Sequence, residues 1–123
     1  MLSINNNPLK LLVIDDEKDY CMLLHRFFYN KGFEVTICHT LEEGLSSLAT
    51  ATFNIVILDN DLPDGLGWDH AHFITATYTG LTLALISAHP RRHNLPVPTS
   101  ALLWEKPISV LELTKIAESQ LKI

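Results

Sequence analysis

The sequence predicts one α/β domain built on a doubly wound, five-stranded parallel sheet with helices on both faces. Apolar runs of strand length recur along the chain, and patterns of apolar residues at helical spacing lie between them. Several of these runs are apolar at every position, which is typical of parallel strands that helices cover on both sides. A chain of 123 residues is long enough for one core and too short for two domains of ordinary size.

The first predicted unit is a strand, a helix and a second strand. The run LLVI at 11–14 is continuous and apolar, so it predicts a buried strand. From Asp16 to about Asn30 the apolar residues fall at helical spacing, and Gly32 stands where the cap at the end of a helix is expected. The segment FEVTIC at 33–38 alternates and is rich in β-branched residues, which favours a strand.

A capping box predicts the start of the next helix. Thr40 is followed three residues later by Glu43, and apolar residues at helical spacing come after it. The third strand is FNIVIL at 53–58. A further helix is expected over 68–78, although its threonines are poor helix formers.

The last part of the chain predicts two more strands and a terminal helix. LTLALIS at 81–87 and ALLW at 101–104 are the fourth and fifth strands. Ser109 and Glu112 form a second capping box, which opens an amphipathic final helix. Between the two strands, the three prolines of segment 88–100 forbid a regular helix over most of its length, so a fourth helix is short or replaced by a loop.

Composition excludes several classes of protein. The net charge of −5 and the pI near 5.6 argue against a nucleic-acid-binding surface. No apolar run approaches the ~20 residues that cross a bilayer, and the first ten residues are too polar for a signal peptide. Cys21 and Cys38 do not suggest a secreted disulfide framework, so reduced thiols in a cytoplasmic protein are expected.

Polar residues follow four of the five predicted strands at the point where each strand ends. Because chemistry in an open parallel sheet collects at the carboxyl ends of its strands, these side chains converge if the four strands are neighbours. The residues are Asp15 and Asp16 after the first strand, Asp59 and Asp61 after the third, Ser87 after the fourth and Lys106 after the fifth.

Several carboxylates in one place need a cation. Two of them about 4 Å apart repel by roughly 4 kcal/mol at an effective dielectric near 20. Lys106 and a hard divalent ion such as Mg²⁺, or Mn²⁺ in its place, would relieve that repulsion. Carboxylates, a metal, a lysine and the hydroxyl of Ser87 together suit phosphoryl transfer, with one aspartate oxygen as the nucleophile.

Each of these residues also has an ordinary structural interpretation. Asp64 and Gly65 favour a simple turn, Asp16 is a candidate helix cap, and Lys106 before Pro107 could be a loop lysine.

Two other acidic-loop sites fit poorly. An EF-hand loop that began at Asp59 would lack its required ligands and glycine. A haloacid-dehalogenase-type phosphatase needs an acidic motif after the lysine, and none is present.

At this point the motifs resemble the receiver domains of two-component response regulators. LLVIDDE resembles the first strand of that family with its acidic pair, and ILDNDLPDGLG resembles the phosphoacceptor loop, with Pro63 four residues and Gly67 eight residues after Asp59. LISA is similar to the strand that ends in a hydroxyl residue. WEKPI is similar to the lysine–proline pair, whose peptide bond is usually cis in the family. The resemblance covers nearly the whole chain from Lys10.

The resemblance implies the CheY-like form of the flavodoxin-like fold, with strand order 2-1-3-4-5. It divides the chain into a flexible N-terminal tail, 1–8, and a receiver domain, 9–123. It further implies that Asp59 accepts a phosphoryl group from a histidine kinase or phosphotransfer protein. The expected metal ligands are Asp15, Asp16, Asp59 and the backbone carbonyl of Asp61.

The remaining roles also come from the resemblance. Lys106 and Ser87 would hold the phosphoryl oxygens, and Asp61 and His89 would modulate dephosphorylation. The domain would hydrolyse its own acyl phosphate and turn over no separate substrate. Its phosphorylated state would act on a downstream protein or a fused output domain, without direct binding to nucleic acid or membrane.

Two departures from the family leave a second interpretation open. Receivers usually carry an aromatic residue three positions before the lysine, where this chain has Leu103, and neighbouring Trp104 points to the opposite face of a strand. The fourth helix is also degraded. Arg91 and Arg92, flanked by His89 and His93, form a small basic patch there, which is either a solvated loop or a surface that docks a partner. The alternative is a pseudo-receiver, an interaction module that signals without phosphorylation.

Overall fold

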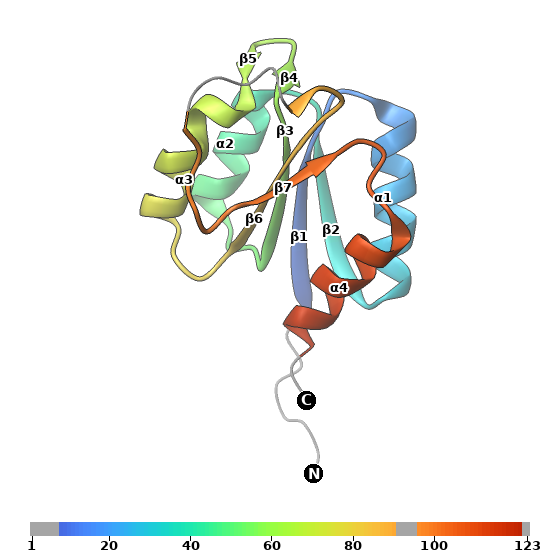
Figure 1. Ribbon diagram of the computed structural model, residues 1–123. Coiled ribbons are helices and arrows are strands. Elements are labelled where there is room, and N and C mark those ends of the chain that lie inside the picture. The colour runs from blue at the N-terminus through green and yellow to red at the C-terminus, as the bar shows by residue number, and fades with distance from the viewer. Residues whose placement is uncertain (1–7, 91–95, 122–123) are drawn as a thin grey trace.

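A computed structural model describes residues 8–90 and 96–121 of the chain (Figure 1). The main elements in chain order are β1 (Leu9–Ile14), α1 (Lys18–Asn30), β2 (Phe33–Cys38), α2 (Leu41–Thr50), β3 (Ile55–Asp59), β4 (Asp61–Leu62), β5 (Gly65–Leu66), a 3₁₀ turn (Gly67–His70), α3 (Ala71–Thr77), β6 (Thr82–Ser87), β7 (Leu102–Glu105) and α4 (Val110–Gln120). Residues 1–7, which make up most of the predicted N-terminal tail 1–8, lie outside the described residues, as do 91–95 and 122–123.

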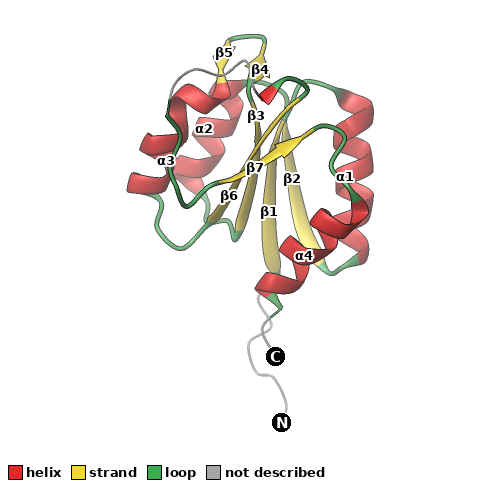
Figure 2. Cartoon of the chain, viewed as in Figure 1, coloured by secondary structure: helices red, strands yellow, loops and turns green. Residues whose placement is uncertain are grey.

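The main sheet has five parallel strands in the order β2-β1-β3-β6-β7. Since β6 and β7 are its fourth and fifth strands along the chain, the predicted order 2-1-3-4-5 is confirmed. The strands β4 and β5 form a separate antiparallel hairpin, which stands above the end of β3 (Figure 2). This hairpin was not predicted, because its two-residue strands are too short to show a pattern.

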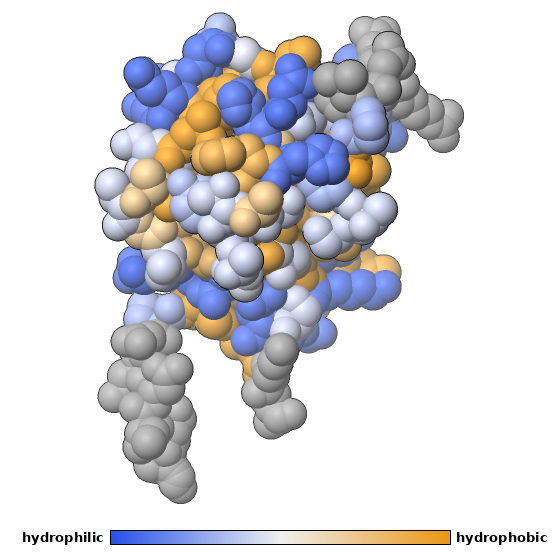
Figure 3. Space-filling view, turned by 90° about the vertical axis from the view of Figure 1, so that its left-hand side faces the viewer, coloured by the Kyte–Doolittle hydropathy of each residue, from blue (hydrophilic) through white to orange (hydrophobic). Residues whose placement is uncertain are grey.

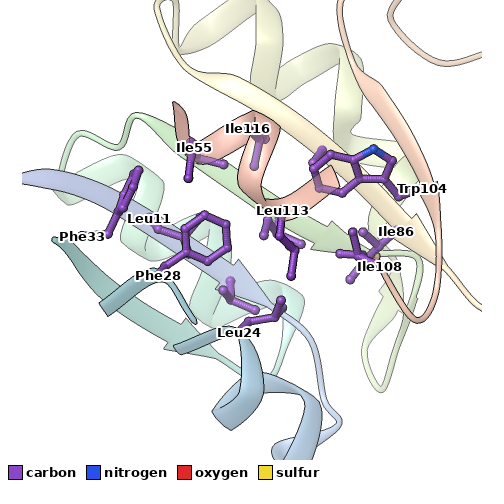
Figure 4. Packing of buried hydrophobic residues seen from close by; sticks show 14 of the residues in the cluster. Leu11, Leu24, Phe28, Phe33, Ile55, Ile86, Trp104, Ile108, Leu113 and Ile116 are labelled. Carbon is purple, nitrogen blue, oxygen red and sulfur yellow. The ribbon is translucent and has the colours of Figure 1, made fainter. Parts of the chain in front are cut away.

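Helices cover both faces of the sheet, so the doubly wound fold is confirmed. In Figure 1, α1 and α4 lie on one face, and α2 and α3 on the other. Figure 4 shows how side chains from α1, α4 and the sheet meet on the first face, with Phe28, Leu113 and Ile116 packed over Leu11 and Ile55. The strands β1 and β3 have fully buried residues pointing to both faces, which explains their uninterrupted apolar sequence.

Local signals in the sequence set where the helices start. The hydroxyl of Thr40 accepts the Glu43 N–H at 3.1 Å, and the hydroxyl of Ser109 accepts the Glu112 N–H at 3.1 Å. Both predicted capping boxes therefore cap a helix. The start of α1 was predicted two residues too early. Its N-cap is Glu17, whose backbone is extended rather than helical and whose N–H donates to the Asp15 carboxylate.

The described end of the proline-rich segment, residues 96–100, packs against the core on the face of the sheet that carries α3. Residues 96–101 contain no helix, Pro98 is buried, and Val97 packs against the core under α3. The imidazole of His72 in α3 hydrogen-bonds the Pro96 carbonyl at 3.2 Å. The predicted basic patch of Arg91 and Arg92 lies outside the described residues. Figure 3 shows that hydrophilic and hydrophobic residues intermingle on the side of the molecule that carries α3.

The strand β7 places its two central side chains on opposite faces, as the alternation predicted. Trp104 is buried in the core beside α4, whereas Leu103 is 52% exposed on the other face. Among the described residues, no helix is both long and apolar enough to cross a membrane.

Candidate functional site

The ends of the four neighbouring strands meet at one edge of the sheet, as the sequence predicted. The parallel register pairs Asp59 with Ile86 across β3 and β6, and Ser87 with Glu105 across β6 and β7. The Lys106 N–H then donates to the Ser87 carbonyl at 2.9 Å. These backbone pairings bring the polar residues that follow the strands into a single group.

Three aspartates form a candidate metal centre. Each of Asp15, Asp16 and Asp59 offers a carboxylate oxygen, and these oxygens all lie within 4.8 Å of one another. Asp15 and Asp59 are buried, and Asp16 is exposed. The Oδ2 atom of Asp15 is buried, and among the described residues its one partner is the Lys106 ammonium at 2.7 Å. A buried carboxylate oxygen with free lone pairs, beside two more carboxylates, fits a hard divalent ion such as Mg²⁺.

Lys106 is the cation that faces this group. Its Nζ lies 2.7 Å from Asp15 Oδ2, 2.5 Å from Glu17 Oε1 and 3.5 Å from Asp59 Oδ2, and its side chain is only 10% exposed. The ring of Tyr20 lies 5.2 Å from the ammonium, while its hydroxyl accepts the Ile108 N–H at 3.0 Å. The Lys106–Pro107 peptide bond is cis, as the resemblance implied.

The electrostatics of the group favour binding of a cation. Burial, followed by the negative charge of Asp15, raises the pKa of Asp59 to about 7, while Lys106 acts in the opposite direction. Burial also raises the pKa of Asp15. Burial alone would lower the pKa of Lys106, but hydrogen bonds to Asp15 and Glu17 outweigh it and raise that pKa. Two buried carboxylates share one ammonium, so a divalent ion would supply the positive charge that keeps both ionised.

The loop after Asp59 packs tightly around that residue. The Gly67 N–H donates to the Asn60 carbonyl, and a Cβ on Gly67 would overlap the Asp59 carbonyl oxygen and touch Leu58. Only glycine therefore fits there without moving the backbone that carries Asp59. The buried indole of Trp68 donates from Nε1 to the Ile86 carbonyl at 3.2 Å, which links this loop to the end of β6.

Ser87 is buried beside Lys106, and its Oγ accepts the His89 N–H at 2.9 Å. A hydroxyl that accepts one hydrogen bond still has its own hydrogen to donate. The His89 side chain is exposed. Asp61 is also exposed, and its charge raises the pKa of Asp59, whereas its backbone N–H lowers it. Every predicted site residue thus lies at this edge of the sheet.

Asp64 is not the plain turn residue that its sequence favours. Its two carboxylate oxygens accept the N–H groups of Leu41 and Glu42 at 2.8 and 2.9 Å, in the first turn of α2. These hydrogen bonds lower the pKa of Asp64. The carboxylate therefore satisfies the free N–H groups at the start of a helix 23 residues upstream, where a negative charge is favourable.

Comparison with known proteins agrees with this geometry. Residues 11–97 match the family described as the response regulator receiver domain. The chain is 30% identical over 80 residues to the transcriptional regulatory protein CusR of Escherichia coli, an alignment that covers 65% of this chain and 35% of CusR. It is 33% identical over 55 residues to the uncharacterized transcriptional regulatory protein YclJ of Bacillus subtilis, covering 45% and 24%. The chain thus spans about a third or less of these curated relatives.

Solved structures show the same fold. A CheY-like receiver domain from Methylobacillus flagellatus has a TM-score of 0.80 and 18% identity, covering 92% of this chain and 98% of that one. The response regulator TrrA from Thermotoga maritima, solved with Mg²⁺ and BeF, has a TM-score of 0.79 and 23% identity. The match covers 90% of this chain and 97% of TrrA. The residues that match the family include Asp15, Asp59 and Ser87. Lys106 lies beyond the end of the matched range, but the fold brings its ammonium to within 3.5 Å of Asp59. The chain belongs to the response regulator receiver domain family.

Proposed function

We propose that the domain is a phosphoacceptor switch in which Asp59 takes a phosphoryl group, with Mg²⁺ bound by Asp15, Asp16, Asp59 and the Asp61 carbonyl. One observation supports this most strongly. The carboxylate of Asp59 is buried between a second buried carboxylate and Lys106, at a site whose oxygen donors fit a divalent ion. The response regulator TrrA, a relative in fold, was solved with Mg²⁺ and BeF.

The proposed reaction is an in-line phosphoryl transfer. An Asp59 oxygen forms a bond to phosphorus while the bond to the donor breaks, and either a histidine imidazole or acetate leaves. Lys106 and Ser87 donate hydrogen bonds to the phosphoryl oxygens, and a Mg²⁺ ion held by Asp15, Asp16 and Asp59 would supply further positive charge there. Water later attacks the phosphorus and releases inorganic phosphate, which restores the Asp59 carboxylate. The domain therefore has no separate substrate in this proposal.

The proposed donor is a histidine kinase or phosphotransfer protein. An apolar groove with a volume of about 600 Å³ runs between α1 and the start of α4. Its lining includes Pro107 and Ile108, which directly follow Lys106, as well as Leu23, Phe27 and Val110. A donor protein that docks on this groove would contact the residues that follow Lys106, whose ammonium lies 3.5 Å from Asp59. The two thiols are free and buried, which suits a cytoplasmic location for this encounter.

The output belongs to another part of the system. The relatives are named as transcriptional regulatory proteins and are about three to four times as long as the aligned segments. The proposed receiver domain, residues 9–123, would pass its state to a fused output domain or to a separate downstream protein. With a net charge of −5, the domain itself is not proposed to bind nucleic acid.

A second candidate is a pseudo-receiver that binds partners without phosphorylation. The observation that favours it is Leu103, which is exposed where receivers usually carry a switching aromatic residue. The residues that bind and accept the phosphoryl group are all present, so the phosphoacceptor proposal is the stronger one.

The two candidates differ in one experiment. The protein is incubated with Mg²⁺ and acetyl phosphate, and its intact mass is measured over time. The phosphoacceptor predicts one added phosphoryl group, lost in Asp59→Asn and kept in Asp69→Asn, an exposed aspartate of the 3₁₀ turn. No modification, or modification that persists in Asp59→Asn, would overturn the proposal and leave the pseudo-receiver.

A further inference from the structure

The Lys106 ammonium is held by an acid outside the proposed metal centre. Its contact with Glu17 is as short as its contact with Asp15, at 2.5 and 2.7 Å, and both are shorter than the 3.5 Å to Asp59. Lys106 also donates a hydrogen bond to the Glu17 carboxylate. The ammonium is therefore drawn toward the Asp15 and Glu17 side of the site.

Within residues 8–90 and 96–121, Lys106 is the one partner of the Glu17 carboxylate. Glu17 is the N-cap residue of α1, yet its side chain makes no capping hydrogen bond to the helix. Its carboxylate is 63% exposed, whereas Asp15 is fully buried. The two acids therefore differ in what they contribute, because the Asp15 contact is fixed in the core and the Glu17 contact is open to solvent.

The side chain of Lys106 packs against Tyr20 on its way to the site. The ammonium lies over the Tyr20 ring, and the Tyr20 hydroxyl fixes the backbone two residues after Lys106. With its backbone fixed at both Ser87 and Ile108, Lys106 can change partners only by rotating its side chain. The ammonium already lies 3.5 Å from Asp59 Oδ2, so a shift away from Glu17 and toward Asp59 has only a short distance to cover.

We propose that Glu17 is a latch for Lys106, which competes with the phosphoryl group on Asp59 for the ammonium and so sets how readily the domain is phosphorylated. This inference rests on the proposed function, since it assigns Lys106 to the phosphoryl oxygens. When the phosphoryl group arrives, Lys106 leaves Glu17 and the first turn of α1 loses an ion pair with the β7–α4 loop. Glu17 thereby acts as a positioning residue through Lys106.

Three variants separate contact from charge. Glu17→Gln removes the charge, whereas Glu17→Asp keeps it on a side chain one methylene shorter, which no longer reaches Lys106. If Glu17 is a latch, both variants bind BeF₃⁻ with Mg²⁺ about fivefold more tightly than the natural protein. That change corresponds to about 1 kcal/mol, the upper end for an exposed ion pair. The matched control is Glu34→Gln, an exposed acid in β2 paired with Lys10.

A second readout needs neither metal nor phosphoryl analogue. The side chain of Lys106 is 10% exposed and its ammonium is paired with two carboxylates, so hydrogen exchange of the ammonium in ¹⁵N-labelled, metal-free protein is expected to be slow by NMR. Glu17→Gln and Glu17→Asp should both speed that exchange, and Glu34→Gln should leave it unchanged. Circular dichroism and the unfolding midpoint check that each variant is folded.

The outcomes distinguish this inference from the proposed function. If the natural protein binds no BeF₃⁻, the phosphoacceptor proposal fails and the latch fails with it. A second outcome is that the natural protein and Glu17→Asp bind BeF₃⁻ with the same affinity, whereas Glu17→Gln binds it more tightly. Glu17 then acts only through the repulsion between its charge and the anion. A third outcome is that both variants match the natural protein in BeF₃⁻ affinity and in ammonium exchange. Glu17 then does not restrain the Lys106 ammonium. Either of the last two results overturns the latch and leaves the phosphoacceptor intact.

Discussion

The backbone N–H of Lys106 donates to the carbonyl oxygen of Ser87 at 2.9 Å. This hydrogen bond continues the parallel ladder between β6 and β7 by one residue past the end of β7. It fixes the main chain of the proposed phosphate-binding lysine against that of the proposed phosphate-binding hydroxyl. Lys106 and Ser87 are therefore placed by the sheet itself, and only their side chains are free to respond to a ligand.

Replacing Lys106 by methionine should destabilise the domain and abolish its phosphorylation. Methionine keeps the apolar stem but leaves the buried Asp15 without its ion-pair partner, which costs about 3 kcal/mol. Added Mg²⁺ should recover part of this loss, because the ion supplies the missing charge. Urea unfolding with and without Mg²⁺ measures the effect. The control is Lys115→Met, which removes an exposed lysine of α4; an equal loss of stability there would contradict the explanation.

Replacing Gly67 by alanine should disturb the loop that carries Asp59. The added methyl group overlaps the Asp59 carbonyl oxygen, so the backbone must shift, at a cost of about 2 kcal/mol. Labelling by acetyl phosphate should slow as a result. Gly80→Ala is the matched control. Alanine at its positive φ of 87° costs about 1 kcal/mol of stability, but an added Cβ would meet no other atom within 4 Å. If Gly80→Ala slows labelling as much as Gly67→Ala, the effect comes from stability alone.

The fold and the proposed site could be predicted because their signals are local. Strands that are apolar on both faces require a parallel sheet, and a parallel sheet brings the residues that follow its strands together. Asp15, Asp59 and Lys106 needed no further information.

Other contacts could not be predicted, since nothing near them in the sequence marks them. Glu17 pairs with a lysine 89 residues away, and Asp64 caps a helix 23 residues upstream. The pair Asp64-Gly65 is typical of a turn, so the sequence did not indicate that the Asp64 carboxylate also caps α2. Tyr20 and Trp68 fit the apolar pattern of their helical segments, so their polar atoms carried no visible signal.

The carboxylate of Asp64 should stabilise α2 in a pH-dependent manner. Its pKa is lowered in the folded state by the N–H groups of Glu42 and Leu41, so its contribution is fully present above the unfolded pKa of about 3.8. The contribution is lost as the pH falls through the lower, folded value. Asp64→Asn should therefore lower the midpoint of thermal unfolding by a few degrees at pH 7 and by less near pH 3. Calorimetry at both values checks this, and an equal shift at each pH would exclude a role for the charge.

Trp68 should report ligand binding at the site through its fluorescence. Its indole is buried and bonded to the Ile86 carbonyl, one residue before Ser87, so a change at Ser87 alters its surroundings. Titration with Mg²⁺ and BeF₃⁻ should change the emission of the natural protein and of Trp104→Phe, but not of Trp68→Phe. The latter also loses one hydrogen bond, which lowers stability by about 1 kcal/mol. A signal that disappears in Trp104→Phe instead would locate the change beside α4.

Replacing His89 by alanine should shorten the lifetime of phosphorylated Asp59. The backbone N–H of His89 is bonded to Ser87 Oγ, so its exposed side chain projects from a point fixed beside the site. An imidazole there would shield a phosphoryl group on Asp59 from the attacking water, and alanine would remove the shield without breaking the backbone hydrogen bond. After removal of acetyl phosphate, loss of the phosphoryl group followed by intact mass should be a few-fold faster than in the natural protein. His25→Ala, which removes a histidine stacked on Tyr29 in α1, should decay at the natural rate. Equal decay in His89→Ala and the natural protein would remove His89 from the proposed modulators and leave Asp61 as the remaining one.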